Sequence, residues 1–281
     1  MEDPFQAPTK EGIRTRLNED YRQYSGPFRH SFRVATWAPL DLSQALVIMG
    51  FPTVGLVGSI ATAHLVESLR LREVGAVLSP ALPPAAVIRD GIGTSPIRVY
   101  LGDMMCGIDG RCDQLCVIHS DITPKSTVVS ALAYSLVAWA KARRARQLVC
   151  LEGLKTEASG GEAHILGIAS DAEGRNLLQR LKIDSLENGL LTGIGGVALY
   201  AARAQDLPAL CFLAQTHEDI PDARGAARLL ELLDPLVPLV PINTLSLYAK
   251  AQALEAAFRE QLEHSSRAMK DLTQRADMMY G

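Results

Sequence analysis

The sequence predicts an α/β protein in which helices cover both faces of a mostly parallel β-sheet, giving three layers (αβα). Short apolar runs of strand-forming residues alternate along the chain with segments of helical spacing, and this alternation is typical of βαβ units. The clearest unit spans residues 46–69, where an apolar run leads through a glycine turn into a helical pattern. Hydrophobic residues make up 48% of the 281 residues, which is enough for a sizeable core.

The first unit also contains a candidate ligand loop. Residues 46–49 form the strand, a turn with Pro52 runs from Gly50 to Gly55, and apolar residues three and four apart follow from Leu56. In such a unit the helix N-terminus points its unpaired N–H groups past the end of the sheet, where α/β proteins often bind ligands. The possible ligand loop consists of Gly50, Pro52, Gly55 and Gly58.

The same criteria place the other elements. Residues 97–118 are expected to form a hairpin around the turn at 107–110, and residues 31–37 are expected to form an edge strand. Asp171 is the expected N-cap of one helix, and Pro221 is expected at an early position of another. The predicted strands are 31–37, 74–78, 97–101, 115–118, 148–151 and 209–214, and the predicted helices after the first unit are 126–145, 171–181 and 221–233.

Two terminal segments flank the predicted α/β domain, which spans residues 30–241. Residues 1–29 are charged and contain prolines, which predicts an N-terminal extension. Pro235, Pro238 and Pro241 predict a stiff, extended connector. Residues 242–281 predict one long C-terminal helix with a narrow apolar stripe, as in a coiled coil or a helix packed on another subunit. The alternative is a terminal helix folded onto its own sheet.

Composition argues against several classes of partner. The formal net charge is −3 without a basic cluster, and aromatic residues are only 5%, so nucleic acid is not an expected partner. No apolar run approaches the roughly 20 residues of a membrane span, so no membrane association is expected. Five cysteines without a secretory signal predict free, mostly buried thiols in a reducing cytoplasm.

The glycine loop fails the sequence tests for nucleotide binding. In a phosphate-binding loop, Leu56 would stand where a lysine must reach the phosphates, and Val57 where a hydroxyl must hold magnesium. In a dinucleotide fingerprint, Thr53 would replace the first glycine. Glycines that allow a tight turn and close packing of helix on sheet are the alternative interpretation.

A metal site is not expected either. Cys106, Cys112, Cys116 and His119 are ligand types, but paired C-x-x-C spacing is absent. On a strand, Cys116 and His119 are three residues apart and point to opposite faces. No metal and no cofactor are therefore assigned.

Polar residues follow two of the predicted strands, where α/β active sites often lie. His119, Ser120 and Asp121 follow one strand, and the other strand is followed by Glu152, Lys155 and Glu157. Such groups can perform acid–base chemistry, but no catalytic motif connects them. The chain is therefore expected not to be an enzyme, and no catalytic residue is assigned.

The last three residues form a candidate binding tail. Met279, Tyr280 and Gly281 provide an apolar residue, a tyrosine and a terminal carboxylate. An aromatic anchor beside a free carboxylate suits capture in a partner pocket that contains a lysine.

An ordered set of motifs resembles the proteasome assembly chaperone family over about residues 44–235. The set consists of GFPTVGLVGSIATAHLVESL, LREVGAVLSPALPPAAVIRDG, SPIRVYLGD, LEGL, ENGLLTGIGGVALYAA and LPALCFLAQTHEDIPDARGAARLLELL. The resemblance implies a nucleoside-phosphorylase-like three-layer domain in a homo-oligomeric, non-enzymatic cytoplasmic protein.

The resemblance also implies a partner, the 20S proteasome. The ending Met279-Tyr280-Gly281 is similar to the hydrophobic–tyrosine–any (HbYX) tail by which proteasome activators dock between α-subunits. On this basis the chain is expected to act as a chaperone of proteasome assembly or as an activator. The alternative is a nucleotide- or small-molecule-binding enzyme with its site at Gly50–Gly58, because parts of the family have been labelled ATP-grasp-like ligases.

Overall fold

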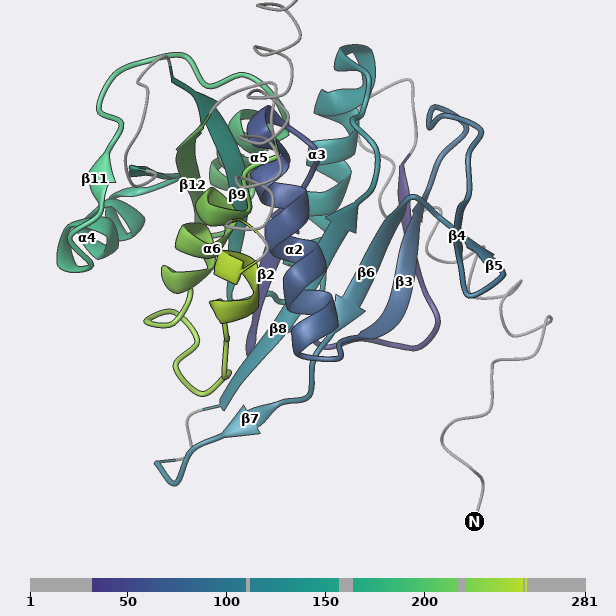
Figure 1. The fold of residues 1–281 in the computed structure, drawn as a ribbon, viewed down its shortest axis with the longest axis horizontal. Helices are drawn as coiled ribbons and strands as arrows, with labels where there is room; N and C mark the ends of the chain where they lie inside the picture. The colour runs from purple at the N-terminus through teal and green to yellow at the C-terminus, as the bar shows by residue number, and fades with distance from the viewer. Residues whose placement is uncertain (1–31, 110–111, 157–163, 217–220, 250, 252–281) are drawn as a thin grey trace, which may run out of the picture.

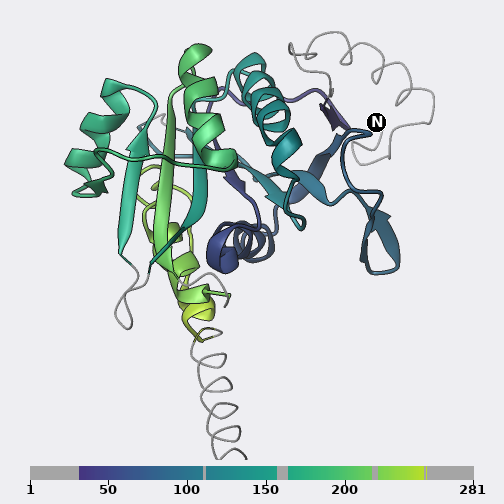
Figure 2. The same cartoon turned by 90° about the horizontal axis from the view of Figure 1, so that it is seen from above.

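The computed structural model describes residues 32–109, 112–156, 164–216, 221–249 and 251, which form a ten-stranded mixed β-sheet with helices on both faces and a separate two-stranded sheet (Figures 1 and 2). The strands are β1 (Arg33–Thr36), β2 (Ala45–Gly50), β3 (Arg72–Leu78), β4 (Val87–Arg89), β5 (Ile92–Thr94), β6 (Ile97–Leu101), β7 (Met105–Cys106), β8 (Cys112–Ser120), β9 (Gln147–Lys155), β10 (Ile165–Ala169), β11 (Asp184–Ser185) and β12 (Ala209–Thr216). The helices are the 3₁₀ turn η1 (Val54–Leu56), α2 (Val57–Ser68), α3 (Ser126–Ala142), α4 (Ala172–Arg180), α5 (Ile194–Ala204) and α6 (Ala223–Glu231).

The centre of the sheet is parallel, as predicted. The strand order is β1-β3-β6-β8-β2-β9-β12-β10-β11, and β8, β2, β9 and β12 run in one direction. On one side β6, β3 and β1 continue the sheet with antiparallel pairs, and on the other side β10 is antiparallel to β12. The sequence of the parallel strands is apolar on both faces because both faces are covered.

Two helical layers bury the two faces. Helices α2 and α6 pack together on one face, and α3 and α5 pack together on the other (Figure 2). Alternate residues of β2 enter different cores: Val47 and Met49 belong to the cluster that includes α3 and α5, whereas Leu46 and Ile48 belong to the cluster that includes α2 and α6. This alternation follows from the period of two along a strand.

Local sequence signals correctly predicted several elements. The hairpin of β6 and β8 is present as an antiparallel pair, and β1 lies at the edge of the sheet. Asp171 caps α4, because its Oδ1 accepts a hydrogen bond from the Gly174 N–H at 2.7 Å.

The proline-based predictions near the C-terminus were wrong. Pro221 precedes α6 rather than lying in its first turn, and Asp222 is the N-cap, accepting from the Gly225 N–H at 2.7 Å. The segment from Pro235 to Pro241 is not an extended connector but a series of turns. Apolar residues between the prolines explain this result, because Leu236, Val237 and Val240 are buried in the core that contains α6.

The prediction of five free thiols was also wrong. Strand β7 pairs with the start of β8 and brings Cys106 opposite Cys112, and the two form a disulfide. Cys116, Cys150 and Cys211 are free and buried, and burial raises the pKa of each thiol. Because disulfides persist mainly in oxidising compartments, cysteine usage no longer argues for a reducing cytoplasm.

The start of the C-terminal segment packs on the protein's own body. Leu247 and Ala251 are buried, the Tyr248 hydroxyl donates to Glu231 at 2.7 Å, and His64 Nε2 of α2 lies 2.6 Å from the Asn243 carbonyl oxygen. The rest of the predicted long helix, the N-terminal extension and the loop at 157–163 lie outside the described residues. Among the described helices, none has the length and apolar character that crossing a membrane requires.

Candidate functional site

The parallel strands place the predicted polar residues at one edge of the sheet. Gly50, the last residue of β2, pairs with His119 of β8 and with Leu151 of β9. Glu152 therefore lies one residue further along β9, near the end at which α/β proteins bind ligands.

The predicted ligand loop connects β2 to α2 across this edge. Gly50 ends β2, Pro52 lies in the turn, Gly55 lies in η1, and Gly58 is in the first turn of α2. Gly55 has a φ of 62°, in the left-handed region that favours glycine. Leu56 has a φ of 54° and is 40% exposed.

Helix α2 approaches the central strands too closely for side chains at two glycines. A Cβ atom added at Gly58 would lie 2.1 Å from the Leu151 carbonyl oxygen. A Cβ atom added at Gly50 would lie 2.1 Å from the Gly58 carbonyl oxygen. Both glycines therefore perform a packing role between helix and sheet.

The loop is also hydrogen-bonded to neighbouring parts of its own chain. The Pro52 carbonyl accepts from the Thr123 hydroxyl at 2.9 Å, and the Gly55 carbonyl accepts from the Asp222 N–H at 2.8 Å. Gly55 also packs against β12, since a Cβ atom there would lie 2.6 Å from the Thr216 side chain. The loop is thus held from both sides by the protein itself.

A buried carboxyl group occupies the start of α5. Glu152 is 4% exposed, and its Oε1 accepts from the Gly195 N–H at 2.8 Å. Burial raises the pKa of Glu152 to about 7, although the Gly195 hydrogen bond acts in the opposite direction. The N-terminus of α5, a position suited to an anion, is therefore filled by a side chain of the protein.

A second polar group runs from α2 to the end of β8. Thr62 Oγ1 lies 2.9 Å from His119 Nδ1, and His119 Nε2 lies 3.4 Å from Asp121 Oδ1. Although this order suggests a nucleophile, a base and an acid, the Thr62 side chain is fully buried and bonded to the Gly58 carbonyl. The arrangement does not present a nucleophile to a substrate.

Arg98 completes this network and was not singled out from the sequence. It is fully buried in β6, donates to Asp121 Oδ2 at 2.6 Å, and donates from Nε to the Tyr100 hydroxyl at 2.6 Å. Burial acts to raise the pKa of Asp121, but His119, Arg98 and Arg89 outweigh it and hold that pKa below its usual value. The apolar run IRVYL gave no signal that its arginine would be buried and paired.

The remaining predicted polar residues are dispersed. The Ser120 hydroxyl donates to the Ile122 carbonyl at 2.7 Å, Lys155 ends β9, and Glu157 lies outside the described residues. The predicted tail, Met279, Tyr280 and Gly281, also lies outside them.

The cysteines and His119 do not gather around one point. Cys116 belongs to the core beside α3, whereas His119 contacts Thr62 of α2, so the two side chains point to opposite faces as predicted. Within the described part of the chain, no group of three or more His, Cys, Asp or Glu side chains has a metal-binding arrangement.

Comparison with known proteins shows similarity over most of the chain. A family model described as the PAC2 family matches residues 47–262. An uncharacterised protein of Methanocaldococcus jannaschii is 28% identical over 241 residues, covering 85% of this chain and 94% of the relative.

Two crystal structures from Pyrococcus furiosus have a similar fold. PbaA, described as an archaeal homolog of proteasome-assembly chaperone, has a TM-score of 0.73 and 27% identity, covering 88% of this chain and 99% of PbaA. PbaB, described as an archaeal proteasome activator, has a TM-score of 0.70 and 19% identity, covering 82% of this chain and 98% of PbaB. At 19% identity, the likeness to PbaB shows the fold alone.

Proposed function

Because the chain belongs to the PAC2 family, we propose that it is a non-enzymatic protein that binds the 20S proteasome core. In this proposal it acts as a chaperone of proteasome assembly or as an activator. The observation that carries the proposal is the family match over residues 47–262, together with the similarity to PbaA along 99% of that protein.

The proposed contact is the C-terminal tail. Met279 and Tyr280 would enter a pocket between two α-subunits, and the Gly281 carboxylate would pair with a lysine there. An HbYX-like ending on a family member is the feature that supports this assignment. The tail belongs to the proposed C-terminal segment, residues 242–281, which follows the α/β domain proposed at residues 30–241.

A homo-oligomer would strengthen such a contact. One tail of three residues buries little area, but several tails on one assembly raise avidity without new contacts.

Removing Tyr280 and Gly281 is expected to abolish co-sedimentation with cognate 20S particles, because the aromatic anchor and the native terminal carboxylate are lost together. Tyr280→Ala is expected to have nearly the same effect. Gln274→Ala, in the same segment but outside the tail, is the matched control and should bind normally. Unchanged sedimentation of the truncated protein, with native circular dichroism, would refute docking through the tail.

The geometry gives the alternative, a nucleotide site at Gly50–Gly58, little support. The loop carbonyls of Pro52 and Gly55 are bonded within the chain, and Glu152 fills the start of α5. Titration calorimetry with ATP and Mg²⁺ is therefore expected to show no binding heat, and a thermal melt should not shift. A saturable heat that Gly55→Ala removes would contradict the proposal.

A further inference from the structure

The accessible sulfur-bearing residues of the described chain all lie in one hairpin. We define this sulfur hairpin as residues 104–109 together with Cys112, so it contains β7 and the first residue of β8. Its sulfur-bearing residues are Met104, Met105 and Cys106, which are exposed, and Cys112, which is half-buried. The other four in the described chain are at most 2% exposed: Met49, Cys116, Cys150 and Cys211. Because oxidation and reduction at sulfur require access, this chemistry is confined to the hairpin.

The Cys106–Cys112 disulfide lies at the end of a very short strand pair. Cys106 ends β7 and lies opposite Cys112, and the two strands share only two residue pairs. No residue of the sulfur hairpin belongs to either hydrophobic core cluster. A ladder of this length is marginal without other support, so the disulfide is the main restraint on β7.

Strand β8, in contrast, is held by the body of the protein from its second residue onward. Asp113 is fully buried, and its carboxylate accepts from Arg146 at 2.8 Å and from the Leu239 N–H at 3.3 Å. Loss of the disulfide would therefore release β7 and the turn after it, and leave β8 and the sheet in place. A bond whose cleavage changes one hairpin without unfolding the protein meets the structural requirement for a switch.

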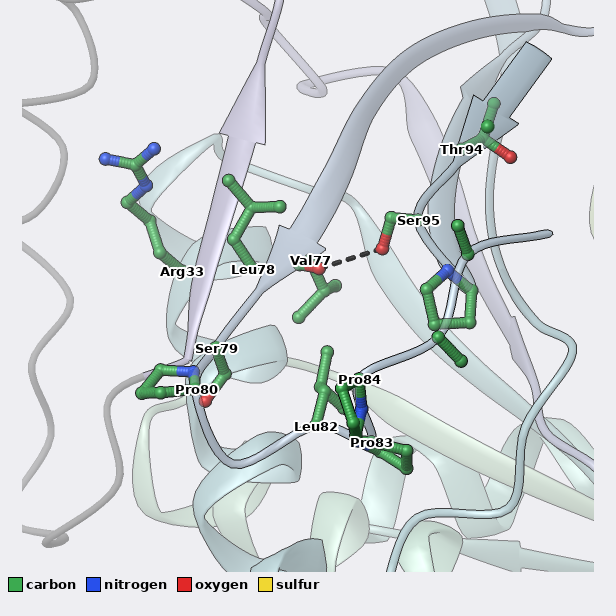
Figure 3. Close-up of a pocket in the computed structure, with 14 residues that line it drawn as sticks. Arg33, Val77, Leu78, Ser79, Pro80, Leu82, Pro83, Pro84, Thr94 and Ser95 are labelled. Atoms are coloured by element: carbon green, nitrogen blue, oxygen red, sulfur yellow. Dashed lines mark hydrogen bonds between the residues drawn. The ribbon is translucent and has the colours of Figure 1, made fainter. Parts of the chain in front are cut away.

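The rest of the described chain offers no competing thiol chemistry. Exchange requires a thiolate, and burial raises the pKa of the Cys116, Cys150 and Cys211 thiols. A cleft of about 770 Å³ lies beside β3, with Leu82 and Ser95 among its lining residues, and none of those residues contains sulfur (Figure 3). A small thiol that enters this cleft meets no disulfide, and the buried thiols are not placed to rearrange the one at the hairpin.

We propose that Cys106 and Cys112 form a reversible thiol–disulfide exchange site that switches the sulfur hairpin between a closed, oxidised form and a released, reduced form. One thiolate of an external dithiol attacks the exposed Cys106 sulfur, and the Cys106–Cys112 bond breaks with Cys112 leaving as a thiolate. The second thiol of the reagent then attacks the reagent's own sulfur in the mixed disulfide and releases Cys106. Overall the protein gains two electrons and two protons, and the dithiol is oxidised to a disulfide.

The switch changes the apolar surface at this end of the sheet. Met104 and Met105 are 48% and 40% exposed, and Ile108 is fully exposed. In the oxidised form the disulfide restrains these side chains, and in the reduced form only two residue pairs do so. The inference is independent of the proteasome as a partner, so it is tested on the isolated protein.

Maleimide labelling and the intact mass of the full chain, which has five cysteines, test the exchange. The folded, oxidised protein is expected to take up no label, and the folded protein reduced with dithiothreitol should take up two. The doubly labelled fraction should follow the ratio of reduced to oxidised dithiothreitol, without a singly labelled form. Cys116→Ala is the matched control and should also take up two labels after reduction. The double variant Cys106→Ser/Cys112→Ser should take up none under either condition.

Hydrogen exchange distinguishes a switch from a static link. On reduction the amide hydrogens of β7 should exchange at least about tenfold faster, whereas β2 and β9 keep their protection and the circular dichroism spectrum stays native. Reoxidation should restore slow exchange. A disulfide that is reduced only after unfolding, more than two labels on the folded protein, or unchanged exchange of β7 would overturn the proposal. Loss of the native spectrum on reduction would also overturn it, because the disulfide would then support the whole fold.

Discussion

Replacing Gly58 with alanine is expected to destabilise the protein by about 4 kcal/mol, the upper range for a single substitution. The new Cβ atom would lie 2.1 Å from the Leu151 carbonyl oxygen, and this oxygen belongs to the central strand β9. Neither α2 nor β9 can move without disturbing a close-packed core. Helix propensity alone favours alanine over glycine by about 1 kcal/mol. The expected loss of stability from the Cβ clash is therefore opposite in sign to the change that helix propensity predicts.

Urea unfolding followed by circular dichroism measures this effect. Gly189→Ala is the matched control, because its nearest neighbour would lie at 3.6 Å, an ordinary contact distance. The control is expected to stay within about 0.5 kcal/mol of the wild type. If Gly58→Ala were as stable as the wild type, the packing role of this glycine would be disproved.

Gly58 illustrates what the sequence can predict. The strand–glycine–helix pattern and the Asp171 cap depend on neighbours in the chain, so they can be predicted from sequence. The contact between Gly58 and Leu151 depends on strand order, which local patterns do not specify. The β4–β5 hairpin was not predicted, although Asp90-Gly91 between the two strands is a typical hairpin-turn sequence.

The candidate site was predictable to a similar degree. Glu152 and His119 were identified because each lies at the end of an apolar strand. Their partners, Gly195 and Thr62, lie 43 and 57 residues away in sequence, and no spacing rule connects them. Arg98 was missed because one arginine within an apolar strand suggests that its side chain faces solvent. Helices cover both faces of this sheet, so the Arg98 side chain is buried instead.

The second large effect is a dependence of stability on pH that arises from Glu152. Its pKa is about 7 in the folded protein, against 4.5 for an unperturbed group. Between these values the folded state holds a proton that the unfolded state has released. The stabilising contribution is therefore complete below pH 4.5 and is lost as pH rises through 7. At about 1.4 kcal/mol per pKa unit, the loss amounts to about 3 kcal/mol.

Glu152→Gln is expected to remove this dependence. Glutamine is neutral at every pH and retains an oxygen that can accept from the Gly195 N–H. Its free energy of unfolding should therefore resemble the wild type at pH 5 and exceed it by about 3 kcal/mol at pH 8. Urea titrations at both pH values measure the difference, and Glu187→Gln, at an exposed site, is the matched control.

The result also decides between two effects that act on the same carboxyl group. Burial favours the neutral acid, whereas the N–H groups and dipole at the start of α5 favour the carboxylate. If Glu152→Gln is less stable than the wild type at pH 8, the start of α5 stabilises the carboxylate by more than burial destabilises it. The pKa of Glu152 would then not be raised. A gain in stability at pH 8 that disappears at pH 5 would instead establish burial as the dominant effect.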